Sequence, residues 1–481
     1  MDISNIFRQN DCVIVIDPAR YTKAQLSQLH EAKPENIVFA LKDSRSRSNL
    51  RANLSKRPIT EHSAGNDYPQ KKERFSLSSG EKDKASEVLN EIKRDPNIHL
   101  FMDRENSAAA WKSSLSPKLT GSHHFESVVQ ARCLEVLGQQ FSDPMSVSVR
   151  PSTPHGLATY IECFVLERLG VPVLYVGRSA VPGFSKLFSG FGSKRREIKL
   201  GILSASSRAE YKSRAAKELE KRRLEYAAAM PDYERIRIER NRGAIFSPMR
   251  YFLRNLKRPS ATAHALKCWS ALNRSCVPFS GDTRDCAIFF LHYQPERTSL
   301  PEASQFAVQL SAILEARLAL PDDMLLLVKE HPSTFSNRCD FKWRSKEFYS
   351  QIAAIPGVQF VDISTDTFEL IDHSSVVITL TGTVGLEALM RGTPAVFLGS
   401  PMLSGVFGQH VYHSFAELQK FLIKARRREF TSDAVIGSVT ECLYEDFENI
   451  FEADEFPKFH QNCAEMYSFY IALFNSLNKS C

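Results

Sequence analysis

Two polar motifs follow apolar runs in the second half of the chain, and their side chains suit the binding of an anion. The motif KEHP occupies positions 329–332 after the apolar run 324–328, and TGT occupies positions 381–383 after the run 376–380. An ammonium group, an imidazole and hydroxyl groups supply the positive charge and hydrogen-bond donors that a phosphate ester needs. The candidate anion-binding residues are Lys329, His331, Thr381, Gly382 and Thr383.

The TGT motif also precedes a predicted helix over residues 384–390, and a second buried strand is expected at 395–398. A strand-loop-helix-strand unit with small residues at its first junction places backbone N–H groups and a helix N-terminus where an anion can bind. Glu387, in the first turns of this helix, is a candidate acceptor for ribose hydroxyls. The alternatives are a βαβ corner without a ligand, and a Glu387 carboxylate that only compensates the helix dipole.

Three further side chains are candidates for catalysis. Glu296 follows the predicted strand 286–293, Asp103 follows the predicted strand 98–102, and His155 precedes the predicted helix 157–169. A carboxylate at a strand end can act as a base, a nucleophile or a stabiliser of a sugar cation, so Glu296 is placed first. Its structural alternative is an ion pair with Arg297, and that of His155 is a partly exposed loop histidine.

Strands alternating with helices must position these side chains, and this alternation predicts parallel sheets with both faces covered. With 481 residues, the chain is too long for one ordinary core. We predict an α/β architecture of two Rossmann-like domains. The predicted segments are an N-terminal Rossmann-like domain at 1–200 with a polar insertion at about 42–96, a basic helical connection at 201–280, a second α/β domain at 281–455, and a helix at 456–481 that packs back.

Composition limits the other classes of function. The formal charge is +7, and residues 184–260 hold about twenty Lys and Arg against about eight Asp and Glu. The long helix expected at 206–230 is either a solvated helix or a surface for an anionic membrane, and no recognition motif points to nucleic acid. The ten cysteines have no CxxC spacing, and no signal peptide or membrane span is found, so we expect a cytoplasmic protein, with possible peripheral association with the inner membrane.

The motifs KxHP and TGTxGxEAxxxGxP, within residues 286–401, resemble the capsular polysaccharide synthesis family. That family has the GT-B glycosyltransferase fold and includes β-Kdo transferases that use CMP-Kdo. The resemblance implies a GT-B-like fold of two Rossmann-like domains facing across a cleft, with the acceptor bound by residues 1–200 and the nucleotide sugar by residues 281–455. The resemblance implies that His331 and Pro332 contact the phosphate and base of CMP. It also implies that Thr381 and Thr383 hold the phosphate, in place of the serine pair of bacterial sialyltransferases.

The expected function is therefore a glycosyltransferase that moves a sugar from a nucleotide donor, preferably CMP-Kdo or a related CMP-ulosonate, to a glycan or glycolipid acceptor. The lack of a DxD pair beside a strand end argues against a metal-bridged donor, so we expect no metal and no cofactor beyond the nucleotide sugar. Two alternatives remain open. One is a UDP-sugar 2-epimerase on the same fold, and the other is a non-catalytic scaffold of a capsule assembly complex.

Overall fold

The computed structural model describes residues 12–16, 37–41, 61–63, 78–103, 129–138, 147–150, 153–154, 156–191, 194–198, 205–224, 259–279, 286–294, 299–335, 344–446 and 450–452. The chain divides into two compact units. The first comprises residues 1–190, 194–211 and 446–481, and the second comprises residues 191–193 and 212–445. Most of the predicted connection at 201–280 thus falls within the second unit.

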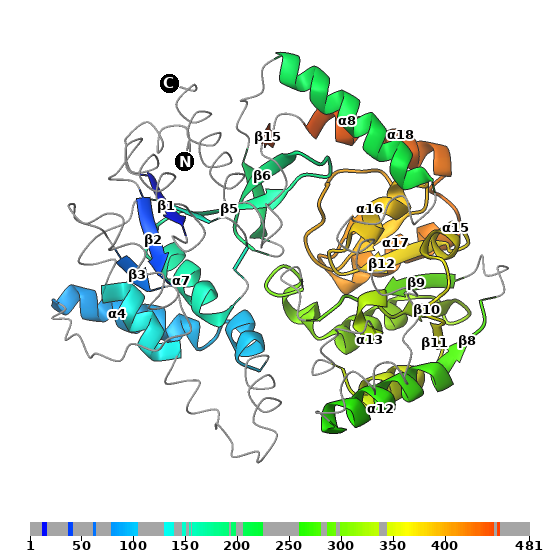
Figure 1. Cartoon of the computed structure of the whole chain (residues 1–481), viewed down its shortest axis with the longest axis horizontal. Coiled ribbons are helices and arrows are strands. Elements are labelled where there is room, and N and C mark those ends of the chain that lie inside the picture. Colours follow the sequence, from blue (N-terminus) through cyan, green and yellow to red (C-terminus); the bar gives the residue numbers. More distant parts are fainter. Residues whose placement is uncertain are drawn as a thin grey trace. The chain divides into compact units, whose positions relative to one another are not determined.

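The second unit is built on a seven-stranded, all-parallel sheet (Figure 1). Its strands are β8 (Cys276–Val277), β9 (Cys286–Phe290), β10 (Leu325–Lys329), β11 (Val358–Val361), β12 (Val376–Thr379), β13 (Ala395–Phe397) and β14 (Gln409–Val411). Their spatial order is β14-β13-β12-β9-β10-β11-β8. Counted from β9, the first six strands follow the order 3-2-1-4-5-6 of a Rossmann sheet, with β8 added beside β11.

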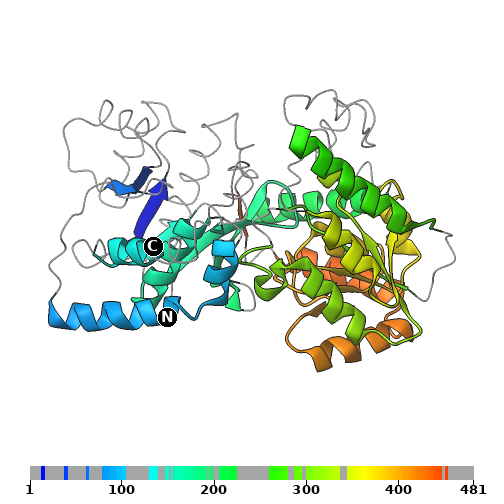
Figure 2. The same ribbon diagram turned by 90° about the horizontal axis from the view of Figure 1, so that it is seen from below.

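Helices cover both faces of this sheet (Figures 1 and 2). They are α12 (Pro259–Ser275), α13 (Gln309–Ala319), α14 (Lys346–Ala353), α15 (Thr367–Asp372), α16 (Thr383–Met390), α17 (Phe415–Arg426) and α18 (Ser432–Glu445), with the 3-10 turns η4 (Ser304–Ala307) and η5 (Pro332–Phe335). One continuous core joins α12, α13, α14 and α17 to alternate strand residues such as Phe289, Val328 and Ile378. Burial on both faces explains why β9 and β12 are uninterrupted apolar runs apart from the final Thr379.

The first unit has a mixed sheet in the order β15-β6-β5-β4-β1-β2-β3, with β7 paired to β6. Its strands are β1 (Cys12–Ile16), β2 (Ile37–Leu41), β3 (Glu61–Ser63), β4 (Val147–Arg150), β5 (Val173–Arg178), β6 (Phe184–Ser189), β7 (Arg196–Ile198) and β15 (Ile450–Glu452). The parallel strands follow the order 3-2-1-4-5, which is again of the Rossmann type. The predicted α/β class with two Rossmann-like units is therefore confirmed.

The end of the described chain returns to the first unit. Strand β15 pairs antiparallel with β6. Asp446, just before β15, forms an ion pair with Lys186 of β6, with 2.7 Å between Oδ1 and Nζ. Lys186 is fully buried and also contacts Glu197 of β7 at 3.1 Å. Two carboxylates thus compensate this buried cation.

The structure corrects two expectations for the first unit. The predicted strand 98–102 lies inside a helix at residues 96–103, in which Ile98 and Phe101 are buried and Asp95 accepts a hydrogen bond from the Ile98 N–H. An Asp N-cap followed by Pro at the first helical position outweighs the β propensity of these residues.

The predicted polar insertion at 42–96 also contains regular structure, namely β3 and α4 (Ser79–Ile92). Ser78 and Glu81 form a capping box at the start of α4. Ala85, Val88 and Ile92 make its buried stripe. Reciprocal capping and an apolar stripe of helical spacing therefore stabilise this helix. The predicted helix at 456–481 lies outside the described residues.

The basic segment contains α8 (Ala205–Arg223), shorter than the predicted helix at 206–230, whose remainder beyond residue 224 is not described. Its exposed cations are Arg208, Lys212, Arg214, Lys217, Lys221 and Arg223. No helix among the described residues is both long and apolar enough to cross a membrane.

Candidate functional site

The carboxyl ends of β9, β10 and β12 form the candidate site in the second unit. The chain order reverses between β9 and β12, because β10 and β11 extend the sheet on one side of β9 while β12 and β13 extend it on the other. Open α/β sheets bind ligands at such a switch point, outside the carboxyl ends of the strands. Both predicted anion-binding motifs lie at this edge.

The turn between β12 and α16 presents a helix N-terminus without a side-chain cap. Gly382 is the N-cap residue of α16, with φ −71° and ψ 148°, and no side chain accepts a hydrogen bond from the first turn. The Thr383 side chain is exposed, and Thr381 and Gly382 are half-buried. Since the first N–H groups of a helix lack intrahelical acceptors, this turn suits an anionic group.

His292, which the sequence did not single out, reaches this turn from the end of β9. Its Nε2 lies 3.0 Å from the Thr379 hydroxyl and accepts a hydrogen bond from the Thr381 N–H at 3.4 Å. A Cβ on Gly382 would lie 2.8 Å from Thr379 Oγ1 and 3.2 Å from His292 Nε2. The turn therefore requires glycine for a close approach, and the imidazole fixes its conformation.

The KEHP motif follows β10, and its side chains lie in different surroundings. His331 is half-buried, and its ring lies 6.1 Å from the Tyr293 ring, centroid to centroid. Lys329 is buried, and its ammonium donates to the Thr365 carbonyl and, at 3.1 Å, to the Thr367 hydroxyl, after β11. Burial lowers the pKa of Lys329 to about 8, and nearby Asp366 and Asp362 oppose that shift. Pro332, also half-buried, begins η5.

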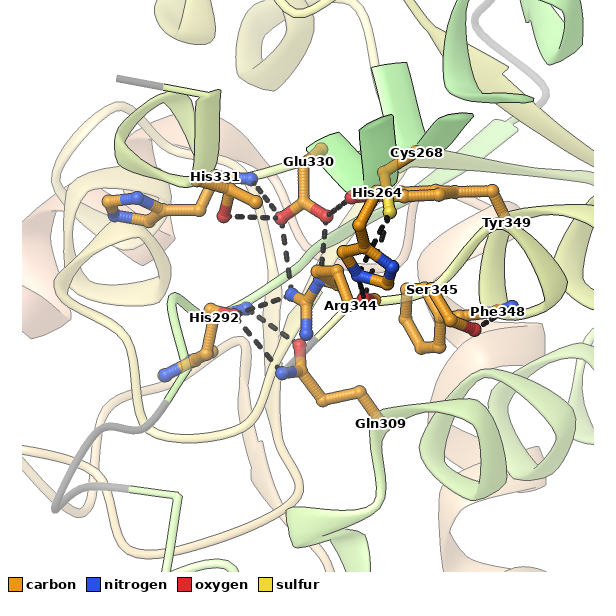
Figure 3. A network of polar contacts seen from close by, with 11 residues as sticks. His264, Cys268, His292, Gln309, Glu330, His331, Arg344, Ser345, Phe348 and Tyr349 are labelled. Atoms are coloured by element: carbon orange, nitrogen blue, oxygen red, sulfur yellow. Dashed lines mark hydrogen bonds and ion pairs between the residues drawn. The ribbon is translucent and has the colours of Figure 1, made fainter. Parts of the chain in front are cut away.

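Glu330 lies between Lys329 and His331 in the chain, and its side chain points to the opposite side of the strand end. It forms a buried network of hydrogen bonds (Figure 3). Its Oε2 accepts from Arg344 Nε at 2.8 Å and from the Tyr349 hydroxyl at 2.8 Å. Its Oε1 accepts from Arg344 Nη2 at 3.1 Å and from the His331 N–H at 2.8 Å. Burial alone would raise the pKa of Glu330, but the Arg344 charge and these hydrogen bonds hold the pKa below its usual value.

Glu387, the candidate ribose acceptor, lies on the second turn of α16 and is buried. Its Oε1 accepts from Arg222 Nη1 of α8 at 2.9 Å, and Arg222 Nε also donates to Glu218 at 2.7 Å. The Arg391 guanidinium, just after α16, donates to the carbonyl oxygens of Arg223 and Leu224 at 2.7 and 3.1 Å. The end of α8 is thereby fastened to α16, and Arg222 is not part of the exposed basic surface.

The three predicted catalytic residues have different positions. Glu296 and His155 lie outside the described residues. Among the described residues, Gln294 and Ser299 flank Glu296 in the sequence, and the Ser299 hydroxyl donates to Gln294 Oε1 at 3.3 Å near the exit of β9. Asp103 is exposed at the end of a helix rather than at a strand end, because the predicted strand before it is helical.

Within the part of the chain that the structure describes, no group of three His, Cys, Asp or Glu side chains is arranged to hold a metal ion. The residues that the sequence missed are His292 and Arg344. His292 has a signal, since it follows an apolar strand directly, as the KEHP motif does. The local sequence around Arg344 gives no such signal, because the partners of Arg344 come from separate elements.

Comparison with known proteins gives one match to a family model. Residues 302–437 match the model of the family described as capsule polysaccharide biosynthesis protein. This segment begins after the β9 loop and contains β10, the β12–α16 turn and part of α18. The resemblance predicted from the two motifs is therefore confirmed over these residues. No curated protein sequence matches the chain significantly.

Several solved structures share the general fold at low identity. The β-Kdo 2,4 transferase KpsC of Thermosulfurimonas dismutans is 14% identical, with 58% of this chain and 79% of that chain covered and a TM-score of 0.30. The UDP-GlcNAc 2-epimerase of Methanocaldococcus jannaschii is 12% identical, with 89% and 97% covered and a TM-score of 0.25. Anabaena Alr3699/HepE, in complex with UDP and glucose, is 11% identical, with 91% and 95% covered and a TM-score of 0.27. Scores this low identify neither the substrate nor the site residues of this chain.

Proposed function

We propose that this protein is a glycosyltransferase of capsule or surface polysaccharide synthesis, and that the second unit binds its nucleotide-sugar donor. The favoured donor is CMP-Kdo or a related CMP-ulosonate, and the acceptor is a glycan or glycolipid. The observation that carries the proposal is the uncapped N-terminus of α16 at the switch point of the sheet, inside the segment that matches the capsule family. We place the reaction in the cytoplasm.

In this proposal, donor phosphate lies against the β12–α16 turn. Thr381 and Thr383 offer hydroxyl groups, Gly382 permits a close approach, the first turn of α16 offers its N–H groups, and His331 offers its imidazole. As the bond to the sugar breaks, negative charge grows on the leaving phosphate, and donors already aimed at that position stabilise it without reorganisation. Pro332 is assigned to the base, and Lys329 adds positive charge from behind the motif. Glu387 stays a candidate for the ribose hydroxyls.

For the acceptor side, Glu296 is proposed as the group that takes the acceptor proton or stabilises the sugar cation, because Gln294 and Ser299, which flank it in the sequence, contact each other near the exit of β9. His155 and Asp103 of the first unit remain alternatives for this role. Transfer is proposed to need no metal ion, so addition of EDTA is expected to leave the rate unchanged.

The first experiment is nucleotide binding by the full-length protein, measured by thermal shift and calorimetry with CMP, CDP, UDP, GDP and ADP. A ligand that binds only the native state raises its melting temperature, and we expect CMP to give the largest shift. His331→Ala is expected to weaken CMP binding by about tenfold, whereas the control His413→Ala, at an exposed position in the same unit before α17, leaves it unchanged.

Other outcomes select the alternatives. A shift with UDP alone, together with conversion of UDP-GlcNAc in the absence of any acceptor, would favour the 2-epimerase. The absence of any shift in a folded sample would favour the non-catalytic scaffold. Binding of CMP at wild-type affinity by His331→Ala would contradict the site assignment while leaving the reaction class open to a direct assay with CMP-Kdo.

We further propose that the exposed basic face of α8 binds an anionic membrane surface, where a glycolipid acceptor would be found. Each Lys or Arg near such a surface contributes about 1 kcal/mol. The test is sedimentation with phosphatidylcholine vesicles with and without phosphatidylglycerol. Changing Lys212, Lys217 and Lys221 to Gln is expected to abolish the preference for anionic vesicles. The same change at Lys346, Lys420 and Lys424, on α14 and α17, is the charge-matched control.

A further inference from the structure

We propose that Glu330 and Arg344 are positioning residues of the candidate donor site, which hold the exits of β9 and β10 so that His292 keeps its place beside the β12–α16 turn and His331 keeps its place at the end of β10. This inference rests on the proposed function, because it assigns both residues to the donor site. Arg344 lies outside the KEHP and TGT motifs, Glu330 is the variable position of KxHP, and neither residue is expected to touch the donor.

The first step is the contact with the turn that carries His331. The carboxylate of Glu330 accepts from the His331 N–H at 2.8 Å and from the Thr334 hydroxyl at 3.1 Å. Both donors belong to the turn 331–335, so Glu330 holds it at two points. Glu330 itself is 1% exposed, and η5 follows it directly in the chain. The orientation of His331 therefore depends on the position of a carboxylate that cannot move into solvent.

The second step is the contact with the exit of β9. Arg344 Nη2 donates to the His292 carbonyl at 2.8 Å as well as to Glu330 Oε1 at 3.1 Å. Gln309, the first residue of α13, also binds both backbone groups of His292. Its Oε1 accepts from the His292 N–H at 2.7 Å, and its Nε2 donates to the His292 carbonyl at 3.1 Å. Both backbone groups of His292 are thus fixed while its imidazole reaches Thr379.

The third step is the continuity of these contacts. A chain of hydrogen bonds runs from the β12–α16 turn through His292 and Arg344 to Glu330 and His331. In Figure 3, His292 and His331 lie on one side of the Arg344 guanidinium, and Tyr349 and Phe348 lie on the other. The planar fork of arginine bridges two acceptors at once, which the single ammonium of lysine does not reproduce.

The network also contacts helices α12 and α14. The Arg344 carbonyl oxygen lies 2.7 Å from His264 Nε2 of α12, and the Tyr349 hydroxyl of α14 donates to Glu330. Helices α12 and α14 pack together on this face of the sheet. Displacement of Arg344 would therefore disturb the strand exits rather than relax into a neighbouring space, because interiors are closely packed.

The test uses the full-length protein and its affinity for CMP, with UDP measured in parallel. Thr334→Val removes one hydroxyl donor to Glu330 with little change in shape, and Thr334→Ser retains it. Arg344→Lys keeps the charge but loses the fork. The control is Tyr412→Phe, which removes a tyrosine-to-glutamate hydrogen bond of 2.5 Å to Glu315, away from the KEHP and TGT motifs.

We expect Thr334→Val to raise the Kd for the nucleotide by about fivefold and Arg344→Lys by about tenfold, while Thr334→Ser and Tyr412→Phe stay within about twofold of wild type. A double-mutant cycle with His331→Ala separates positioning from general destabilisation. If Glu330 acts through His331, Thr334→Val has no further effect once His331 is removed, whereas a purely structural effect persists in that background.

The outcomes are distinguishable. If wild type binds no nucleotide, the proposed function fails and this inference fails with it. If wild type binds and His331→Ala weakens binding, but Thr334→Val and Arg344→Lys bind as wild type does, the inference is overturned and the proposed function stands. If Arg344→Lys does not fold, Thr334→Val and its cycle decide alone.

Discussion

The two units contain the same topological element, and they use it differently. In each Rossmann-like sheet, the fourth parallel strand of the 3-2-1-4-5 order leads into a helix with a glycine N-cap. These elements are β4 and α7 (Leu157–Arg168) in the first unit and β12 and α16 in the second. Each helix carries a buried glutamate on its second turn, Glu162 or Glu387, that binds an arginine.

The difference lies in where the arginine comes from. In the first unit it is Arg150, the last residue of β4, which binds Glu162 at 2.6 Å and is 4% exposed. An arginine that is held by a carboxylate therefore occupies the end of that strand. In the second unit the arginine is Arg222 of α8, and the end of β12 carries small hydroxyl and glycine residues instead. The same topology thus carries an ion-paired arginine at the strand end in one unit and small residues, where we propose that an anion binds, in the other.

The largest expected effect is on stability, when either arginine is removed. Arg150→Ala leaves Glu162 buried, with Arg132 at 3.5 Å as a weaker partner, and is expected to lower the free energy of unfolding by about 3 kcal/mol. Arg222→Ala is expected to cost about half as much, because the Arg222 side chain is 13% exposed against 5% for Arg150, although Arg222 also binds Glu218. Urea denaturation measures both, and a larger loss for Arg222→Ala would reverse the comparison.

The matched control for this pair is Arg426→Ala. Arg426 makes an exposed ion pair with Asp323, so its loss is expected to change the free energy of unfolding by less than about 0.5 kcal/mol. An effect as large as that of Arg150→Ala would mean that exposure does not separate these pairs.

Next in size is the pH dependence from Lys329, a buried cation of the second unit that donates to oxygens of Thr365 and Thr367. Its pKa is about 8 in the folded protein, against 10.5 as the reference value. Between these pH values the unfolded chain binds more protons, so stability rises with pH, and below pH 8 the charged lysine lowers stability by about 3 kcal/mol. Lys329→Met is expected to remove this rise from the unfolding free energy measured between pH 7 and 10.5. Parallel curves for the two proteins would contradict the low pKa.

A smaller effect, on binding, compares the two glycine N-caps. Gly382→Ser places a Cβ 2.8 Å from Thr379 Oγ1 and a hydroxyl at the helix N-terminus, so nucleotide affinity is expected to fall about tenfold. A Cβ at Gly156, the N-cap of α7, would meet no atom within 4 Å, and Gly156→Ser is expected to leave affinity unchanged. Equal affinities of the two variants, measured by calorimetry, would remove the functional contrast between the strand ends.

The smallest effect is the stability of Gly156→Ser itself. A serine at this extended position supplies the side-chain acceptor that α7 lacks, and is expected to add a few tenths of a kcal/mol to the free energy of unfolding. Urea denaturation against wild type checks the sign, and a loss of stability would show that the cap cannot form.

Much of the second unit could be predicted from the sequence, because its strands are short apolar runs separated by turn residues. The runs beginning at Cys286, Val376 and Ala395 correspond to β9, β12 and β13. The positions of the KEHP and TGT motifs at strand ends could be predicted because each motif directly follows such a run. Local patterns of this kind predict where each strand ends as well as where it lies, and therefore which residues lie at the carboxyl edge of the sheet.

The remainder depends on contacts between distant parts of the chain. His292 matters because the pairing of β9 with β12 brings its ring to Thr379, and this register does not appear in the local sequence. Glu387 pairs with Arg222, 165 positions away, so its local position on the helix could not predict its partner. At residues 96–103 the predicted strand was wrong although the sequence carries a local helix signal. Asp95 and Pro96 indicate a helix start, but the strand prediction relied on the apolar residues that follow them.

The pairing of β15 with β6 bears on how the chain folds during synthesis. Residues 446–452 supply both the edge strand and the Asp446 carboxylate that compensates buried Lys186, yet the ribosome makes them about 260 residues after β6. The first unit therefore cannot acquire its complete sheet while the second is still being translated. Until then β7 covers only Leu187–Ser189, so residues Phe184–Lys186 of β6 present an open edge and Lys186 lacks one of its two carboxylates, which exposes the nascent first unit to pairing with other chains.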